Sequence, residues 1–193
     1  MGATWHLPDT KTNKRTKMKI PKDCLLEKIC SRDATRPAIN RPFLDIKDGI
    51  AHLIGTNGRA IAVIPVEIGQ DDTQGHIPVD GLKAARKAAK GKGVEIDAKA
   101  NGSFALSTGQ SFPRGVDATF PNWRQVIPAN KTFVFEIGLD AEILLNLAQA
   151  LGSDGQVRLS FTGAQDPISV RAMSGPLKYK DEVKAVIMPV RIS

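Results

Sequence analysis

Apolar and polar positions along this chain repeat in a common order three times, at an interval of roughly 55 to 60 residues. Each time, a short apolar stretch leads into a segment with apolar residues at helical spacing, and alternating segments separated by turn residues follow. The pattern predicts three units of strand, helix and about three strands, which is an α+β fold. Three repeated units describe the chain better than one irregular α+β domain does.

The first predicted unit begins at Ile20. Asp23 is expected to cap a short amphipathic helix. The apolar side chains of this helix are Cys24, Leu25, Leu26, Ile29 and Cys30. Strands joined by tight turns are expected next, because Lys47-Asp48-Gly49 and Asn57-Gly58 interrupt an alternating pattern and Asn-Gly favours a hairpin. The predicted bounds of these strands are 43–46, 50–56 and 59–66.

The second and third units repeat this order. In the second, a brief strand at 77–79 precedes a helix at 82–90, with Asp80 as the expected N-cap and glycines just beyond the helix end. Strands at 94–98 and 103–107 follow, joined by the turn Asn101-Gly102. The third unit is predicted to contain a strand at 132–137, a helix at 140–151 and strands at 156–162, 168–173 and 183–192.

A connector at 119–130 separates the second unit from the third. Pro121 and Pro128 each remove a backbone donor and hold the preceding residue extended, which excludes a helix or an uninterrupted central strand. A solvated linker is excluded by the apolar side chains of Phe120, Trp123, Val126 and Ile127. We therefore expect an extended connector that packs on the structure at either side.

The odd number of units determines the expected domain organisation. If two units pair to close a domain, residues 20–128 form one complete domain and residues 129–193 remain a half domain. Residues 1–19 lie outside the repeats and are interpreted as a basic N-terminal arm. A half domain exposes strand edges and an apolar helix face, so we expect a homodimer through it. The alternative is a monomer whose half domain packs on the first domain.

The net charge of +7 favours a polyanionic partner such as nucleic acid, although a solvated basic surface has the same composition. The predicted helix at 82–90 concentrates this charge. Its basic residues are Lys83, Arg86, Lys87 and Lys90, with Lys92 just beyond. Because it lacks the aromatic, Asn and Gln side chains that read bases, it is expected to contact the phosphates of double-stranded DNA. The alternative is an exposed Ala/Lys helix.

The sequence indicates no catalytic chemistry. Acidic residues are dispersed and the three histidines stand singly, so we expect neither an enzyme, a metal site nor a cofactor. Cys24 and Cys30 are predicted to be reduced thiols, because their spacing points them to different faces of a helix. The sequence contains no apolar stretch of about 18 residues and no signal peptide, which predicts a cytoplasmic protein without membrane contact.

Three stretches resemble motifs of bacterial beta sliding clamps, the processivity factors of the replicative DNA polymerase. The stretch 56–63, Thr-Asn-Gly-Arg-Ala-Ile-Ala-Val, resembles the family's Thr-Asp-Gly-His-Arg-Leu-Ala. The stretch 116–128, Val-Asp-Ala-Thr-Phe-Pro-Asn-Trp-Arg-Gln-Val-Ile-Pro, resembles Val-Asp-Gly-Arg-Phe-Pro-Asp-Tyr-Arg-Arg-Val-Leu-Pro. The stretch 185–192, Ala-Val-Ile-Met-Pro-Val-Arg-Ile, resembles Val-Val-Met-Pro-Met-Arg-Leu. The repeated units extend the resemblance back to about Lys17.

The resemblance implies repeated clamp-type domains and a hydrophobic cleft that captures short linear motifs of polymerases and other replication or repair proteins. By motif position, the cleft would be lined by Thr56, Gly58, Ile61, Pro128, Met188, Pro189, Val190 and Arg191. An apolar groove with a few polar groups at its edge suits a peptide with one or two large apolar anchors. The alternative is that these residues form only a domain junction.

The chain also departs from the family pattern. Family members are usually three-domain chains that close a six-domain ring as dimers, whereas this chain resembles the middle domain and the second half of the last one. An ordinary ring does not follow from that. Asn57, Ala60 and Trp123 replace the motif's Asp, Arg and Tyr, which bears on partner choice rather than on the fold. We expect a clamp-like, non-catalytic accessory protein of DNA replication or repair; the alternative is a regulator that occupies partner motifs without holding DNA.

Overall fold

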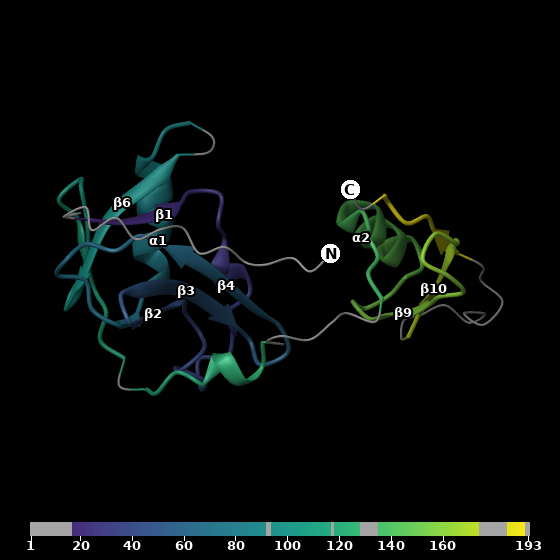
Figure 1. Ribbon diagram of the computed structural model, residues 1–193, viewed down its shortest axis with the longest axis horizontal. Helices are drawn as coiled ribbons and strands as arrows, with labels where there is room; N and C mark the ends of the chain where they lie inside the picture. Colours follow the sequence, from purple (N-terminus) through teal and green to yellow (C-terminus); the bar gives the residue numbers. More distant parts are fainter. Residues whose placement is uncertain (1–16, 92–93, 117, 128–134, 174–184, 192–193) are drawn as a thin grey trace. The chain divides into compact units, whose positions relative to one another are not determined.

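The computed structural model of the protein describes residues 17–91, 94–116, 118–127, 135–173 and 185–191. The chain divides into two compact units, and each is described by itself. We call residues 4–127 the larger body and residues 128–193 the smaller body (Figure 1).

The described strands of the larger body form two antiparallel sheets (Figure 1). The first has the order β4-β3-β2-β5, and these strands are Ile61–Val66, Ile50–Thr56, Phe43–Lys47 and Gly75–His76. The second has the order β1-β6-β7-β8, and these strands are Met18–Pro21, Glu95–Asn101, Ser103–Leu106 and Ser111–Pro113. The predicted strands beginning at 43, 50, 59, 94 and 103 are confirmed to within three residues at each end.

The two halves of the larger body exchange their first strands. The first half contains β1, the 3-10 turn η1 (Leu26–Lys28) and β2 to β4, and the second contains β5, α1 (Val79–Ala88) and β6 to β8. β1 pairs with β6 of the second half, with Met18 opposite Ala98. β5 pairs with β2 of the first half, with His76 opposite Phe43. Each half therefore contributes a strand to the sheet of the other.

The helix expected after Asp23 is wrong in length and in its cap. Only the 3-10 turn η1 forms, Leu25 occupies its N-cap position, and no side chain caps it. Backbone bonds from Lys22 N to Val94 O (2.9 Å) and from Cys24 N to Pro21 O (3.1 Å) hold the entry to this segment in a non-helical turn. The helix therefore begins late, and Leu26 is its buried residue.

The helix α1 begins earlier than its sequence pattern predicted. Pro78 occupies the N-cap position, so the strand expected at 77–79 and the cap expected at Asp80 are both wrong. The φ of −66° at Pro78 suits the start of a helix without a capping side chain, and Asp80 lies in the first turn, where its charge complements the helix dipole. At the other end, Lys22 Nζ donates to the carbonyl oxygens of Ala89 (2.7 Å) and Gly91 (2.8 Å).

The main core lies between the two sheets and the helical segments of both halves. It contains Met18, Ile20, Leu26, Leu44, Leu53, Ile77, Leu82, Ile96 and Phe104 among its buried side chains. The opposite face of the first sheet carries a second cluster, formed by Ile39, Phe43, Ile54 and Phe120. Neighbouring strand residues such as Phe43 and Leu44 belong to different clusters because side chains alternate between the two faces of a sheet.

The connector packs on this second cluster. The Phe120 ring stacks on the Phe43 ring at 4.6 Å between centroids, and Trp123 packs against the same cluster from the 3-10 turn η2 (Trp123–Gln125). The expectation that the connector is packed is confirmed for residues 118–127 on the larger body. Its last residues, 128–130, lie outside the described part of the chain.

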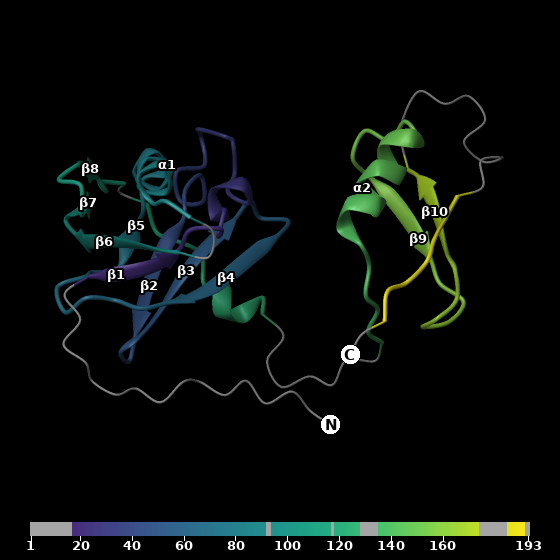
Figure 2. The same ribbon diagram turned by 90° about the horizontal axis from the view of Figure 1, so that it is seen from above.

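The smaller body consists of α2 (Ala141–Ala150) against a sheet of order β11-β10-β9 (Figure 2). These strands are Val186–Ile187, Ile168–Ala172 and Val157–Ser160. Asp140 caps α2 by accepting from the backbone N–H groups of Glu142 (2.9 Å) and Ile143 (3.0 Å). Leu151, Ile168, Val170 and Ile187 form the buried core. Of the strand predicted at 132–137, residues 132–134 lie outside the described ranges and residues 135–137 do not form a strand.

Candidate partner-binding and nucleic-acid surfaces

The turn at Thr56 is held by its own side chains. Thr56 Oγ1 donates to Ala60 O (2.7 Å) and accepts from Gly58 N (3.1 Å). Asn57 Oδ1 accepts from the backbone N–H groups of Arg59 (2.8 Å) and Ala60 (2.9 Å). These bonds fix the backbone of the hairpin between β3 and β4, and Gly58 takes the left-handed conformation (φ 87°) that the Asn-Gly pair predicts.

Arg36 lies over this turn, a contact that sequence reasoning missed. Its Nη1 donates to Asn57 O at 3.0 Å, and a Cβ added at Gly58 would lie 2.8 Å from Nη2. Gly58 therefore provides both the positive φ and the space for this guanidinium. Arg36 belongs to a polar loop far from the turn in sequence, so no local pattern pairs the two. Ile61, at the start of β4, packs against the second cluster and stays partly exposed.

The C-terminal motif lines a cavity of about 610 Å³ in the smaller body. Its lining residues are Glu136, Ile137, Gly138, Ala164, Gln165, Met188, Pro189, Val190 and Arg191. Val190 N donates to Gly138 O at 3.0 Å, which fixes the motif against the segment before α2. Met188 and Val190 are about half exposed, so apolar surface remains available to a ligand.

The residues predicted for one cleft belong to both bodies. Thr56, Gly58 and Ile61 lie in the larger body, Met188 to Arg191 lie in the smaller body, and Pro128 lies outside the described residues. Within each body the structure brings the predicted residues together. The single cleft itself stays a prediction.

A second cavity, of about 390 Å³, lies where the connector crosses the larger body. Its lining includes Phe43, Asp45, Gln74 and the connector residues from Ala118 to Arg124. The Asp45 carboxylate is mostly buried and accepts from Arg124 Nη2 (2.5 Å) and Trp123 Nε1 (3.3 Å). Sequence reasoning missed Asp45 because it is a single acidic residue in an alternating strand.

His52 lies opposite Asp45 on β3 and packs against the Trp123 ring at 5.4 Å between centroids. Burial lowers the pKa of His52 below its ordinary value of 6.5, the Arg124 charge lowers it further, and Asp45 opposes both. Its buried Nδ1 has no hydrogen-bond partner among the described residues. The neutral imidazole is therefore the form that suits this site.

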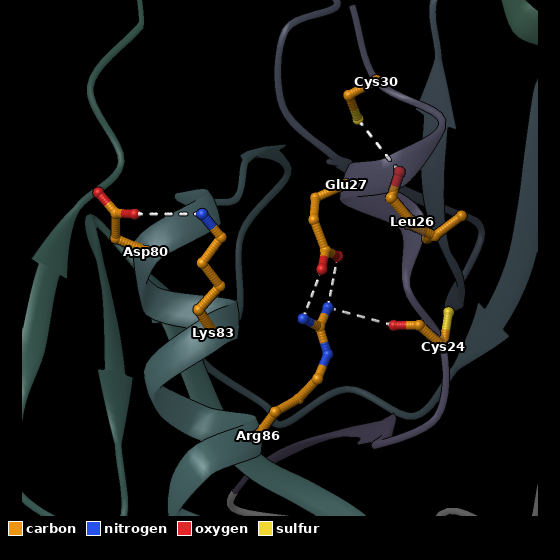
Figure 3. Close-up of polar contacts among 7 residues, drawn as sticks. All are labelled: Cys24, Leu26, Glu27, Cys30, Asp80, Lys83 and Arg86. Atoms are coloured by element: carbon orange, nitrogen blue, oxygen red, sulfur yellow. Dashed lines mark hydrogen bonds and ion pairs between the residues drawn. The ribbon is translucent and has the colours of Figure 1, made fainter. Parts of the chain in front are cut away.

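Arg86 does not share the exposed face of α1 with the lysines. Its guanidinium donates from both Nη atoms to the Glu27 carboxylate and from Nη2 to Cys24 O at 3.3 Å (Figure 3). The side chains of Arg86 and Glu27 are only 14% and 12% exposed. The expectation that Arg86 faces DNA is therefore corrected: it joins α1 to η1 inside the larger body.

The other predicted DNA-binding residues lie differently. Lys83, Lys87 and Lys90 are exposed, and Lys83 Nζ lies 4.0 Å from Asp80 in the first turn of α1 (Figure 3). Lys92 lies outside the described residues. The described basic surface of this helix is thus made of lysines, which act as flexible point charges rather than as a planar fork.

The cysteines are free, as the sequence predicted. Burial raises the pKa of Cys30 to about 11, and burial also raises the pKa of Cys24, so both remain thiols at neutral pH. Within the described ranges, no group of three or more His, Cys, Asp or Glu side chains could hold a metal ion. None of the described helices is long and apolar enough to cross a membrane.

Solved bacterial sliding clamps share this fold. The DNA polymerase sliding clamp of Bacillus subtilis matches with a TM-score of 0.64 and 21% sequence identity, over 95% of this chain and 51% of its own. The DNA polymerase III beta subunit of Thermotoga maritima matches with a TM-score of 0.65 and 18% identity, over 98% of this chain and 54% of its own. The beta subunit from the DNA polymerase of Streptococcus pyogenes matches with a TM-score of 0.66 and 14% identity, over 97% and 53%.

These matches confirm the resemblance predicted from three short motifs, at the level of the fold. The chain spans about half the length of the solved structures it matches. No family model and no curated protein matches the sequence.

Proposed function

We propose, from the sliding-clamp fold, that this chain is a clamp-like accessory protein of DNA replication or repair. It would bind double-stranded DNA and recruit a polymerase or another replication or repair protein through a short apolar motif, without catalysis of its own. The observation that carries the proposal is the match to solved sliding clamps over 95% or more of the chain in the three structures described. Self-association of the chain belongs to the same proposal.

The proposed peptide contacts are apolar groups beside fixed backbone. They are Thr56, Gly58, Ile61, Pro128, Met188, Pro189, Val190 and Arg191. The support is that the Thr56 turn is held by four hydrogen bonds of its own and that Met188 and Val190 leave apolar surface exposed at a cavity. A prepositioned apolar surface suits a peptide whose large apolar side chains supply most of the binding energy.

The proposed DNA contacts are the exposed lysines of α1, namely Lys83, Lys87 and Lys90, with Lys92 beyond the helix. Lysine contacts to phosphates give attraction that does not depend on base sequence and weakens steeply with salt. The net charge of +7 supports the same partner. Arg86 is no longer part of this proposal, because Glu27 already pairs with it.

Peptide binding tests the partner-recruiting half of the proposal. A fluorescein-labelled peptide that carries a bacterial clamp-binding motif should raise its anisotropy on addition of the protein. Met188→Ala should weaken this binding by about 1 to 2 kcal/mol, or roughly 5- to 30-fold, because it truncates an apolar contact. Val186→Ala is the matched control: Val186 is equally exposed in the smaller body but does not line the cavity.

Two outcomes count against the cleft. If the unmutated protein does not bind the peptide, partner recruitment through this motif is rejected. If Met188→Ala and Val186→Ala weaken binding equally, the peptide binds elsewhere on the smaller body or through non-specific apolar contact.

A further inference from the structure

The larger body shows how one half of this architecture is completed by another. Each half contributes helical residues to a shared core, with Leu26 from η1 and Leu82 from α1. Each half also places its first strand at the edge of the other half's sheet: β1 lies beside β6, and β5 lies beside β2. In both halves, the first paired strand after the helical segment therefore has its outer edge covered by the opposite half.

β9 is the corresponding strand of the smaller body, because it is the first strand after α2. It pairs with β10 on one side, and no other described strand pairs with it. Val157 and Leu159 pack on the small core, whereas Arg158 and Ser160 are exposed. The strand is thus a regular alternating one that resembles β6, without the partner that β1 provides there. Such an edge readily accepts another strand.

α2 shows a matching difference from α1. Both helices contain ten residues and precede the corresponding strands. In α1, Leu82 and Ala85 are buried, whereas the residues at the same positions of α2, Leu144 and Leu147, are only partly buried. No described residue within α2 is fully buried.

The exposed side of α2 is apolar. Ile143 and Leu145 are 54% and 58% exposed. Where α1 places Arg86 against Glu27 of the opposite half, the same position of α2 is Ala148, so no charged partner is needed at this point. A ten-residue helix with so much uncovered apolar surface indicates an interaction surface rather than a solvated face.

We propose that a second copy of this chain covers the surface, with its smaller body pairing at the β9 edge and packing on Ile143 and Leu145 of α2. The occupant is a second copy because the exchange seen in the larger body is reciprocal and joins like halves. A two-fold pair of smaller bodies offers each copy the strand edge and apolar face that it lacks. The proposal does not depend on DNA or peptide binding.

Light scattering of the full chain after size exclusion tests this assembly without either ligand. The unmutated protein should have the mass of two chains at micromolar concentration and above. The double variant Ile143→Glu, Leu145→Glu should have the mass of one chain, because it places charge on the proposed contact. Both positions are more than half exposed, so its circular dichroism should match that of the unmutated protein. Gln149→Glu, exposed on the same helix, is the control and should keep the two-chain mass.

The contradicting results are specific. A one-chain mass of the unmutated protein at every concentration overturns the proposal. A two-chain mass of the natively folded double variant also overturns it, because the contact would then lie elsewhere. If the double variant does not fold, Leu145→Lys alone provides the same test at the more exposed position: one chain supports the proposal and two chains overturn it.

Discussion

Arg86 and the lysines of α1 have opposite surroundings although they lie within two turns of one helix. Arg86 follows Leu82 by four residues and Ala85 by one, so it lies beside the buried stripe of the helix. A helical wheel places it at this boundary, but only the fold brings Glu27 to meet it. This is why counting basic residues predicted a charged helix correctly and assigned one of its charges to the wrong role.

Arg86 is therefore predicted to stabilise the fold rather than to bind DNA. Arg86→Ala leaves the Glu27 carboxylate, which is 12% exposed, without its partner and should lower the free energy of unfolding by about 3 kcal/mol. Lys83→Ala is the matched control, because its exposed contact with Asp80 should contribute less than about 0.5 kcal/mol. Urea unfolding followed by circular dichroism measures both. Equal losses in the two variants would contradict the assigned role.

His52 links the connector to pH. Because its pKa is lowered in the folded protein, the unfolded chain binds a proton more readily than the folded one. The stability that this difference provides is complete above pH 6.5 and is lost as the pH falls from 6.5 through the folded-state pKa. His52→Gln should therefore make the free energy of unfolding less dependent on pH in that window.

Urea unfolding at a series of pH values below 7 measures this effect as a slope, so a change in baseline stability does not confuse it. His76→Gln should flatten the profile in the same direction, since burial lowers the pKa of His76 as well. An unchanged slope in His52→Gln would show that the residue titrates alike in both states.

At the scale of elements, local signals and long-range pairing differ in how well they can be predicted. The turns at Asp48-Gly49, Asn57-Gly58 and Asn101-Gly102 carry their geometry in their own residues, and each glycine has the positive φ that such turns use. The hairpins they join were predicted for that reason.

The exchange of β1 and β5 between the sheets was not predictable in the same way. Both strands are short, and their partners lie across a helical segment and other strands in the sequence. No property of residues 18–21 specifies β6 rather than β2 as the partner. The same limit applies to Arg36 over Gly58 and to Asp45 beneath Arg124, because each pair is made by chain topology.

At the scale of the whole molecule, the repeated order of elements was the strongest sequence signal. It predicted the fold class, and the matches to solved clamps confirm the fold at 14 to 21% identity in the three structures compared. A cleft assembled from residues of both bodies could be proposed only from the resemblance, because Thr56 and Met188 carry no feature that pairs them. Function therefore depends on whether one molecule joins the two kinds of partner.

The most direct test of the clamp-like function is whether the protein holds a partner peptide on DNA. Duplex DNA is immobilised on a surface plasmon resonance chip, the protein is bound at low salt, and the clamp-binding peptide is then passed over it. We predict a peptide signal that requires the protein. The Lys83→Glu, Lys87→Glu, Lys90→Glu variant should lose DNA retention and still bind the peptide in solution. If the unmutated protein binds the peptide in solution but is not retained by DNA at any salt concentration, the clamp-like function is contradicted, and a regulator that occupies partner motifs is favoured instead.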